Sequence, residues 1–109
     1  MKMTSECVDG YLCIGLAGEL DHHAAKEIMK SCAALIDERL PNGCVVDMQR
    51  VEFMDSSGIA LLMNIYGRLR TIDASYRVIN VNSQPMRVID AAGLKKIISI
   101  KEADYEKAQ

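Results

Sequence analysis

Residues 53–62 read Phe-Met-Asp-Ser-Ser-Gly-Ile-Ala-Leu-Leu. An acid, two hydroxyl residues and a glycine here separate an apolar pair from a new apolar series. Asp and Ser often cap helices, because their side-chain oxygens accept hydrogen bonds from the first unpaired backbone N–H groups. The pattern predicts a strand that turns into a helix, capped by Asp55, Ser56 or Ser57. Gly58 would let that helix pack closely against its neighbours.

The same residues also suit a chemical role. A serine at a helix N-terminus, once phosphorylated, lies near unpaired N–H donors and the positive end of the helix dipole. Asp55 beside it would add repulsion, so the phosphorylated form would carry a local cluster of negative charge. Such a cluster at a packed interface repels a partner or desolvates poorly. The stretch therefore predicts a phosphorylation switch.

The bulk composition limits the functions that this chain could have. Its 109 residues suffice for one domain with a core, and half of them are hydrophobic. A net charge of −2 argues against direct binding of nucleic acid, which needs a clustered basic surface. No apolar run approaches the roughly 20 residues of a membrane span, and the N-terminus lacks a signal peptide's apolar core. We expect a single domain over 1–109 that is cytoplasmic, with no membrane contact.

Enzymatic and metal-binding patterns do not fit this sequence. A serine hydrolase elbow needs glycine two residues before and after the nucleophile, and neither Ser56 nor Ser57 has both. His22 and His23 are adjacent, so on a helix they point about 100° apart and cannot hold a metal together. Gly58 stands alone in its turn, which excludes a Walker-type phosphate loop. We expect no catalytic activity, no metal and no cofactor.

An Asp-Gly pair at residues 9–10 lies between two β-rich runs, 3–8 and 11–17. Such a pair predicts a two-residue hairpin turn between antiparallel strands. In that register Cys7 and Cys13 miss each other by one position and point to opposite faces, which disfavours a disulfide. None of the four cysteines belongs to a C-x-x-C motif, and buried free thiols suit a reducing compartment.

The next segment predicts a helix and a strand. Asp21 is a natural N-cap for a helix over 22–39. Apolar residues recur in it at helical spacing and would form its buried stripe: Ile28, Cys32, Leu35, Ile36 and Leu40. Pro-Asn-Gly at 41–43 ends the helix, and Cys-Val-Val-Asp-Met at 44–48 predicts a short central strand.

After residues 53–62 the chain continues to alternate helix and strand. The second helix should bury one face made of Gly58, Leu61, Leu62, Ile65 and Leu69, with Asn64, Arg68 and Thr71 opposite. Residues 76–81 predict a strand, and a short helix follows with Ser83 as N-cap, Pro85 in its first turn and Gly93 at its end. Ile97, Ile98 and Ile100 suggest a last strand, and residues 102–108 a final polar helix.

The order of these elements predicts an α/β domain. One hairpin followed by alternating helices and strands gives a small mixed sheet of about four to five strands. The central connections would be parallel and right-handed, with helices packed mainly on one face.

Three blocks of this chain resemble the STAS family, and within it the sporulation anti-sigma factor antagonists. They are Gly-Glu-Leu-Asp-His-His-Ala-Ala at 18–25, Phe-Met-Asp-Ser-Ser-Gly-Ile at 53–59, and Pro-x-Arg-x-x-Asp-x-x-Gly-Leu-x-Lys-Ile-Ile at 85–98. The likeness covers residues 5–100 and implies the STAS fold. Either of the first two blocks alone would be weak, but together they are specific.

The resemblance implies a regulator that works by binding and is itself a substrate. In the family, an anti-sigma factor that is also a serine kinase of the GHKL ATPase type holds a sigma factor inactive. The unphosphorylated antagonist binds this kinase and frees the sigma factor. The kinase then phosphorylates the first serine of Asp-Ser-Ser-Gly, here Ser56, and the antagonist lets go until a serine phosphatase resets it.

By the same resemblance, the partner-binding residues are Asp21, Asp55, Ser56, Ser57 and Gly58. Ser57 is expected to cap or support the helix. Ala60 stands where the family often has a second glycine, so contacts with the cognate kinase would differ in detail. The alternative function is a stand-alone STAS scaffold in another kinase-controlled complex, for stress signalling or transport regulation.

Overall fold

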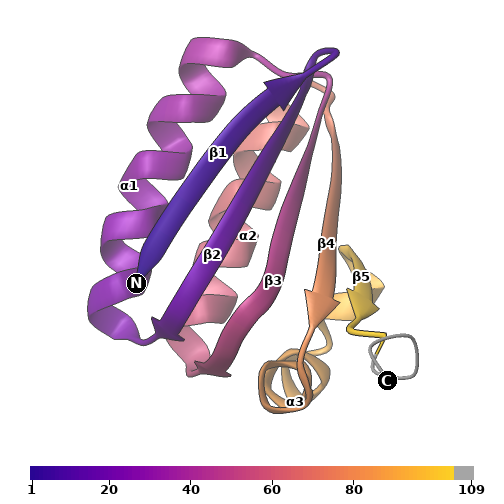
Figure 1. Cartoon of the computed structure of the whole chain (residues 1–109). Helices are drawn as coiled ribbons and strands as arrows, with labels where there is room; N and C mark the ends of the chain where they lie inside the picture. Colours follow the sequence, from indigo (N-terminus) through magenta and orange to yellow (C-terminus); the bar gives the residue numbers. More distant parts are fainter. Residues whose placement is uncertain (105–109) are drawn as a thin grey trace.

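A computed structural model describes residues 1–104 of the chain (Figure 1). Five strands form one sheet: β1 (Lys2–Val8), β2 (Tyr11–Leu20), β3 (Gly43–Met54), β4 (Ser75–Val81) and β5 (Ser99–Glu102). The helices between them are α1 (His22–Arg39), α2 (Ser56–Thr71), α3 (Ser83–Ala92) and a 3-10 turn, η1 (Leu94–Lys96).

The strands lie side by side in the order in which they occur along the chain. β1 and β2 are antiparallel, and every later pair is parallel. Because parallel connections are right-handed and each one steps in the same direction, successive helices fall on the same face. Figure 1 shows α1 and α2 together behind the sheet, with α3 beyond the ends of β3 and β4. The predicted fold class is confirmed.

The hairpin has the predicted register. Asp9 and Gly10 both have positive φ, 51° and 83°, which is the backbone of a tight hairpin turn. Cys7 therefore pairs with Leu12 rather than Cys13. All four cysteines are free thiols, but the expectation that they are buried is right only for Cys32 and Cys44, since Cys7 is exposed and Cys13 is half-buried.

The core lies between the sheet and the helices. In α2 the five residues predicted to be buried are all buried. In α1 the prediction is right for Ile28, Cys32 and Ile36, but Leu35 is only half-buried. Leu40 was wrongly placed in the stripe, since it is 63% exposed. The helix has already ended there: Leu40 adopts a left-handed conformation as the C-cap and donates its N–H to the Ile36 carbonyl at 2.9 Å.

β3 runs to Met54 and is much longer than the predicted 44–48. Twice it advances by one residue more than its partner β2, once between Asp47 and Arg50 and once between Val51 and Phe53. Such bulges break the alternation of inward and outward side chains. Buried positions in β3 are consequently spaced by two and then by three: Cys44, Val46, Met48, Val51 and Met54. Because the buried residues are not spaced regularly by two, the sequence pattern did not indicate that the strand continues after residue 48.

Three details near the C-terminus also differ from the prediction. Ser83 is the first residue of α3, and Asn82 occupies the N-cap position. Gly93 does end α3, with a φ of 68°. The last strand begins only after Ile98, because residues 94–96 form η1. Of the predicted final helix over 102–108, Glu102 belongs to β5, and residues 105–109 lie outside the described part.

Burial changes the acidity of two thiols in the core. It raises the pKa of Cys32 from 9.0 to about 11 and that of Cys44 from 9.0 to about 12, where the nearby Cys32 and Cys13 contribute further. Unfolding would return both to ordinary values. The folded state therefore holds more protons between pH 9 and 12, and stability should fall as the pH rises through that window.

We expect the thiols to react in order of exposure with a water-soluble disulfide reagent at neutral pH. Cys7 is exposed and should react first, and Cys13, which is half-buried, should follow. Cys32 and Cys44, each 1% exposed, should react only when the protein is unfolded in denaturant. Reaction of all four cysteines at a single rate in native buffer would contradict this packing.

Candidate functional site

The candidate site lies where β2 and β3 end. Leu20 and Met54, the last residues of the two strands, are paired, and the Asp55 N–H donates to the Leu20 carbonyl at 3.3 Å. α1 and α2 each begin within two residues of these ends. Parallel pairing thus brings two helix N-termini to one edge of the sheet, as Figure 1 shows at the arrowheads of β2 and β3.

Each N-terminus is capped by an aspartate. Asp21 Oδ1 accepts a hydrogen bond from the Ala24 N–H at 2.9 Å, as predicted. Asp55 Oδ1 accepts one from the Ser57 N–H at 2.8 Å. Of the three capping candidates in α2, Asp55 is therefore the N-cap, and Ser56 and Ser57 are the first two residues of the helix. Ser57 was expected to cap or support the helix, and it does not cap it, because its backbone N–H is the group that Asp55 caps.

The two serines differ in their surroundings. Ser56 is exposed, and within residues 1–104 its hydroxyl has no hydrogen-bond partner. Ser57 is half-buried, and a hydrogen bond of 3.3 Å joins its Oγ to Nδ1 of His22 in α1. Ser56 is thus the accessible hydroxyl at this helix N-terminus.

Gly58 fixes the distance between α2 and the strands beneath it. A Cβ at this position would collide with the Met54 side chain and come within 3.2 Å of Leu20 Cδ2. A residue without a side chain is therefore required for α2 to begin directly after β3. Gly58 serves packing, as the sequence predicted.

Two amide side chains form hydrogen bonds with the last part of β3, beyond the point where its pairing with β4 ends. Gln84, in the first turn of α3, accepts from the Met54 N–H at 2.8 Å and donates to the Met54 carbonyl at 3.0 Å. The Asn82 amide donates to the carbonyls of Gln49 and Val51 at 2.9 Å each. These bonds take the place of ladder bonds and support the turn that carries Ser56. Sequence reasoning missed both amides, and their only signal was an amide-rich segment following a strand.

A shallow groove of about 520 Å³ opens beside Ser56, between α2 and α3. Its lining is largely apolar, with one cation: Ser56, Ile59, Gln84, Arg87, Val88, Ala91 and Ala92. Because Gln84 both lines the groove and clamps Met54, the groove wall and the serine turn are connected through one side chain.

The STAS domain family matches residues 2–106. The chain belongs to this family. The anti-sigma F factor antagonist of Paenibacillus polymyxa is 32% identical over 91 residues, which cover 84% of this chain and 78% of that one. The anti-sigma-B factor antagonist of Listeria monocytogenes is 27% identical, over 85% of this chain and 81% of that one.

Solved structures agree with the family assignment. The anti-sigma factor antagonist SpoIIAA in its unphosphorylated form superposes with a TM-score of 0.82 at 27% identity, covering 98% of this chain and 92% of that one. Its phosphorylated form from Bacillus gives a TM-score of 0.73 at the same identity, over 98% and 96%. The STAS fold expected from the sequence is confirmed.

This STAS domain brings the predicted site residues together. Four of them follow directly after the C-terminal ends of β2 and β3: Asp21, Asp55, Ser56 and Ser57. Gly58 packs beneath them against Met54 and Leu20. The two histidines diverge: His22 meets Ser57, while His23 pairs with Glu27 of its own helix at 3.6 Å. Among residues 1–104 no cluster of three metal-ligating side chains occurs, and no helix is long and apolar enough to cross a membrane.

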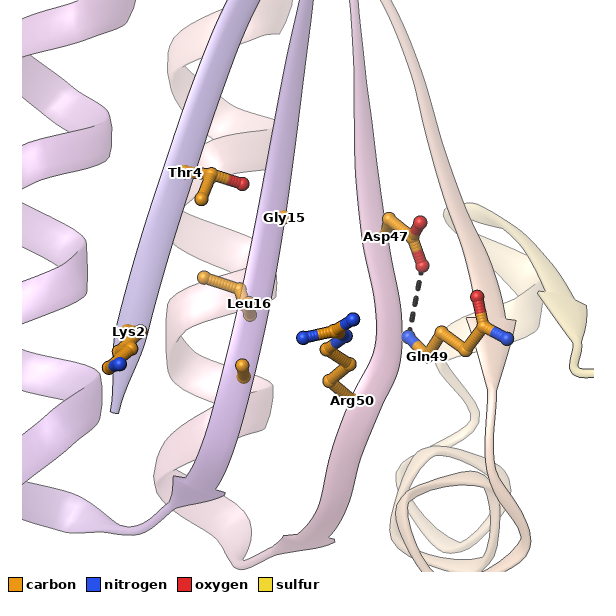
Figure 2. A pocket seen from close by; sticks show the side chains of 8 residues that line it. Lys2, Thr4, Gly15, Leu16, Asp47, Gln49 and Arg50 are labelled. Atoms are coloured by element: carbon orange, nitrogen blue, oxygen red, sulfur yellow. Dashed lines mark hydrogen bonds between the residues drawn. The ribbon is translucent and has the colours of Figure 1, made fainter.

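The open face of the STAS sheet carries a second hollow, of about 260 Å³, that contains none of the predicted site residues. Figure 2 shows it between β1, β2 and β3, with Lys2, Gly15 and Arg50 around it. Asp47 at its border is already engaged, since it accepts from the Gln49 N–H at 2.9 Å and from the Asn80 amide at 3.1 Å. This hollow lies on the opposite side of the sheet from α2.

We expect Gly58→Ala to destabilise the STAS domain by about 1–3 kcal/mol, because the added methyl overpacks Met54 and Leu20. Gly67→Ala is the matched control in the same helix, since a Cβ at Gly67 meets nothing within 4 Å. That change should be neutral or stabilise by about 0.5–1 kcal/mol. Urea unfolding of both variants measures the difference, and equal effects would refute the close-packing role of Gly58.

Proposed function

We propose that this STAS domain is an anti-sigma factor antagonist switched by phosphorylation of Ser56. In its unphosphorylated form it binds an anti-sigma factor, a serine kinase of the GHKL ATPase type, and so releases a sigma factor. Transfer of phosphate to Ser56 ends the binding, and a serine phosphatase restores it. The observation that carries the proposal is an exposed serine at a capped helix N-terminus, beside an apolar groove, in a relative of such antagonists.

The groove supplies the surface that a partner would bury. Ile59 and Val88 face it from two helices, Ala91 and Ala92 leave room, and Arg87 adds a positive charge. An apolar side chain followed by a carboxylate on the kinase would match this lining. Ser56 forms part of the same wall, so a partner seated here covers the hydroxyl that it later modifies.

Phosphorylation would act through charge rather than through unfolding. A phosphate adds about −1.5 to −2 charges and three acceptor oxygens. At the first position of α2 it lies at the positive end of the helix dipole, so the helix tolerates it. The partner would not, because the phosphate lies next to the Asp55 carboxylate and inside an otherwise apolar contact. Together with Asp55 the phosphate exceeds the single positive charge that Arg87 brings to the groove, and burying the surplus negative charge costs more than the contact contributes.

In this proposal the protein acts in the cytoplasm and influences transcription only through the sigma factor. Its net charge of −2 argues against direct binding of nucleic acid. Sporulation is the process we propose for it, because relatives above 30% identity are antagonists of an anti-sigma F factor.

We expect Ser56→Asp to weaken kinase binding by roughly tenfold or more, because it adds a second carboxylate beside Asp55 in a desolvated contact whose lining holds one cation, Arg87. Ser56→Ala should bind as the wild type does and accept no phosphate. Ser56→Asn is the matched control, with the shape of Asp but no charge. Titration calorimetry of the three variants against the kinase, with nucleotide present, measures these affinities.

Differences in folding stability should not account for differences in affinity among these variants, because Asp55 rather than Ser56 caps α2. Ser56→Ala should change the free energy of unfolding by less than about 0.5 kcal/mol, and Ser56→Asp should add stability near the helix dipole. Wild-type affinity in Ser56→Asp would show that charge at this serine is not the release signal.

A second test addresses the groove. Val88→Asp should weaken kinase binding by roughly tenfold or more, since it puts a carboxylate in the apolar lining. Val8→Asp is the matched control: Val8 is 46% exposed and lies at the hairpin turn, at the far end of the sheet. If both variants lose affinity equally, or neither does, the groove between α2 and α3 is not the docking surface.

A further inference from the structure

The two neighbouring serines at the start of α2 face different helices. Successive residues of an α-helix point about 100° apart. Ser56 lines the groove beside α3, whereas Ser57 turns toward α1 and meets the ring of His22 at 3.3 Å. We propose that His22 is a specificity-determining residue that confines phosphorylation to Ser56 by occupying the hydroxyl of Ser57. The inference rests on the proposed function, in which a kinase modifies this turn.

Two hydrogen bonds fix the backbone that carries His22 beside the turn that carries Ser57. His22 is the first residue of α1, and the Asp21 cap fixes that turn through the Ala24 N–H at 2.9 Å. The bond from the Asp55 N–H to the Leu20 carbonyl joins the chain leading into α1 to the turn leading into α2. His22 and Ser57 therefore both lie in capped first turns of helices, and the hydrogen bond between their side chains joins these two turns.

His23 shows that the position matters and not only the residue type. It follows His22 directly and is also exposed, yet its ring points along α1 to Glu27, with Nε2 at 3.6 Å from the carboxylate. One histidine of the pair thus contacts the phosphorylation turn and the other does not. The chain carries its own matched control.

The chemistry of transfer explains how a hydrogen bond selects between two serines. The serine Oγ forms a bond to the γ-phosphorus of ATP while the bond from that phosphorus to the β,γ-bridging oxygen breaks. The hydroxyl proton passes to a base on the kinase or to water, and ADP leaves. Attack requires an Oγ that is roughly in line with the breaking bond.

Ser56 can meet that requirement as it stands, because its hydroxyl is exposed and has no partner within residues 1–104. Ser57 cannot, because its Oγ is directed at α1 and bonded to His22, and its backbone N–H is held by Asp55. To react, Ser57 must give up the histidine bond and rotate outward. Removing His22 removes that barrier.

The decisive experiment follows phosphate by site-resolved mass spectrometry, with the anti-sigma kinase and Mg-ATP. In the wild type we expect phosphate on Ser56. In the Ser56→Ala background, adding His22→Ala should raise phosphorylation of Ser57 by roughly three- to tenfold, the factor by which the loss of one net hydrogen bond shifts an equilibrium. Adding His23→Ala instead should leave Ser57 as it was.

A second measurement needs no kinase. Ring nitrogen NMR shifts of both histidines should be recorded in the wild type and in Ser57→Ala. Loss of the hydroxyl should move the His22 resonances and leave those of His23 unchanged. Unmoved His22 resonances would overturn the contact on which the inference depends.

Failure of the inference can be told from failure of the proposed function. Phosphate on Ser56 in the wild type, with no gain at Ser57 when His22 is replaced, overturns the inference and leaves the function standing. A wild-type chain that binds the kinase but takes no phosphate, or takes it on Ser57 alone, overturns both. Melting curves of each variant confirm that the comparison is made on folded protein.

Discussion

The position of α2 depends on the close contact of Gly58 with Met54 and Leu20. Because no side chain intervenes, a single residue, Asp55, separates the end of β3 from the start of the helix, and the first helical turn lies directly on the end of the sheet. That placement determines the rest of the site. It brings the Asp55 backbone to the Leu20 carbonyl, and it sets Ser56 against α3 while Ser57 meets α1. A longer connection would let the serine turn move independently of both neighbouring helices.

The turn is rigid from the other side as well. β3 and β4 pair only as far as Asp47 and Ile79, so the last part of β3 lacks a strand on that side. The side-chain amides of Asn82 and Gln84 supply hydrogen bonds there instead. One glutamine amide can both accept from the N–H and donate to the carbonyl of the same residue, here Met54. The backbone that carries the serine turn is thereby held in a fixed place before any partner arrives. A binding surface prepared in this way loses less conformational entropy on association.

Sequence patterns predicted those features whose causes are local. The hairpin turn, the Asp21 cap and the buried face of α2 each depend on residues close together in the chain, and all three were right. The missed features join distant segments. His22 and Ser57 are 35 residues apart, and Gln84 reaches Met54 across 30.

Errors at element ends have similar causes. Asn82 and Ser83 are both residues that cap helices well, so composition could not decide which would take the position. Leu40 satisfied the helical spacing of α1 but lies one residue beyond its end. The local pattern allowed both a capped helix start and a phosphorylation switch at Ser56, and the resemblance to the STAS family is what favoured the switch as a proposal.

The two bulges of β3 matter for how this chain can change over evolution. Ten residues of β2 are matched by twelve of β3, so the strand contains two extra residues before the serine turn. Each extra residue lies in a bulge of its own, which keeps Val51 and Met54 facing the core although the buried positions there are three residues apart. Deleting one extra residue would restore regular alternation at that bulge and leave Met54 buried. Single insertions and deletions at the two bulges should therefore survive selection, whereas one elsewhere in the strand would exchange its inward and outward faces.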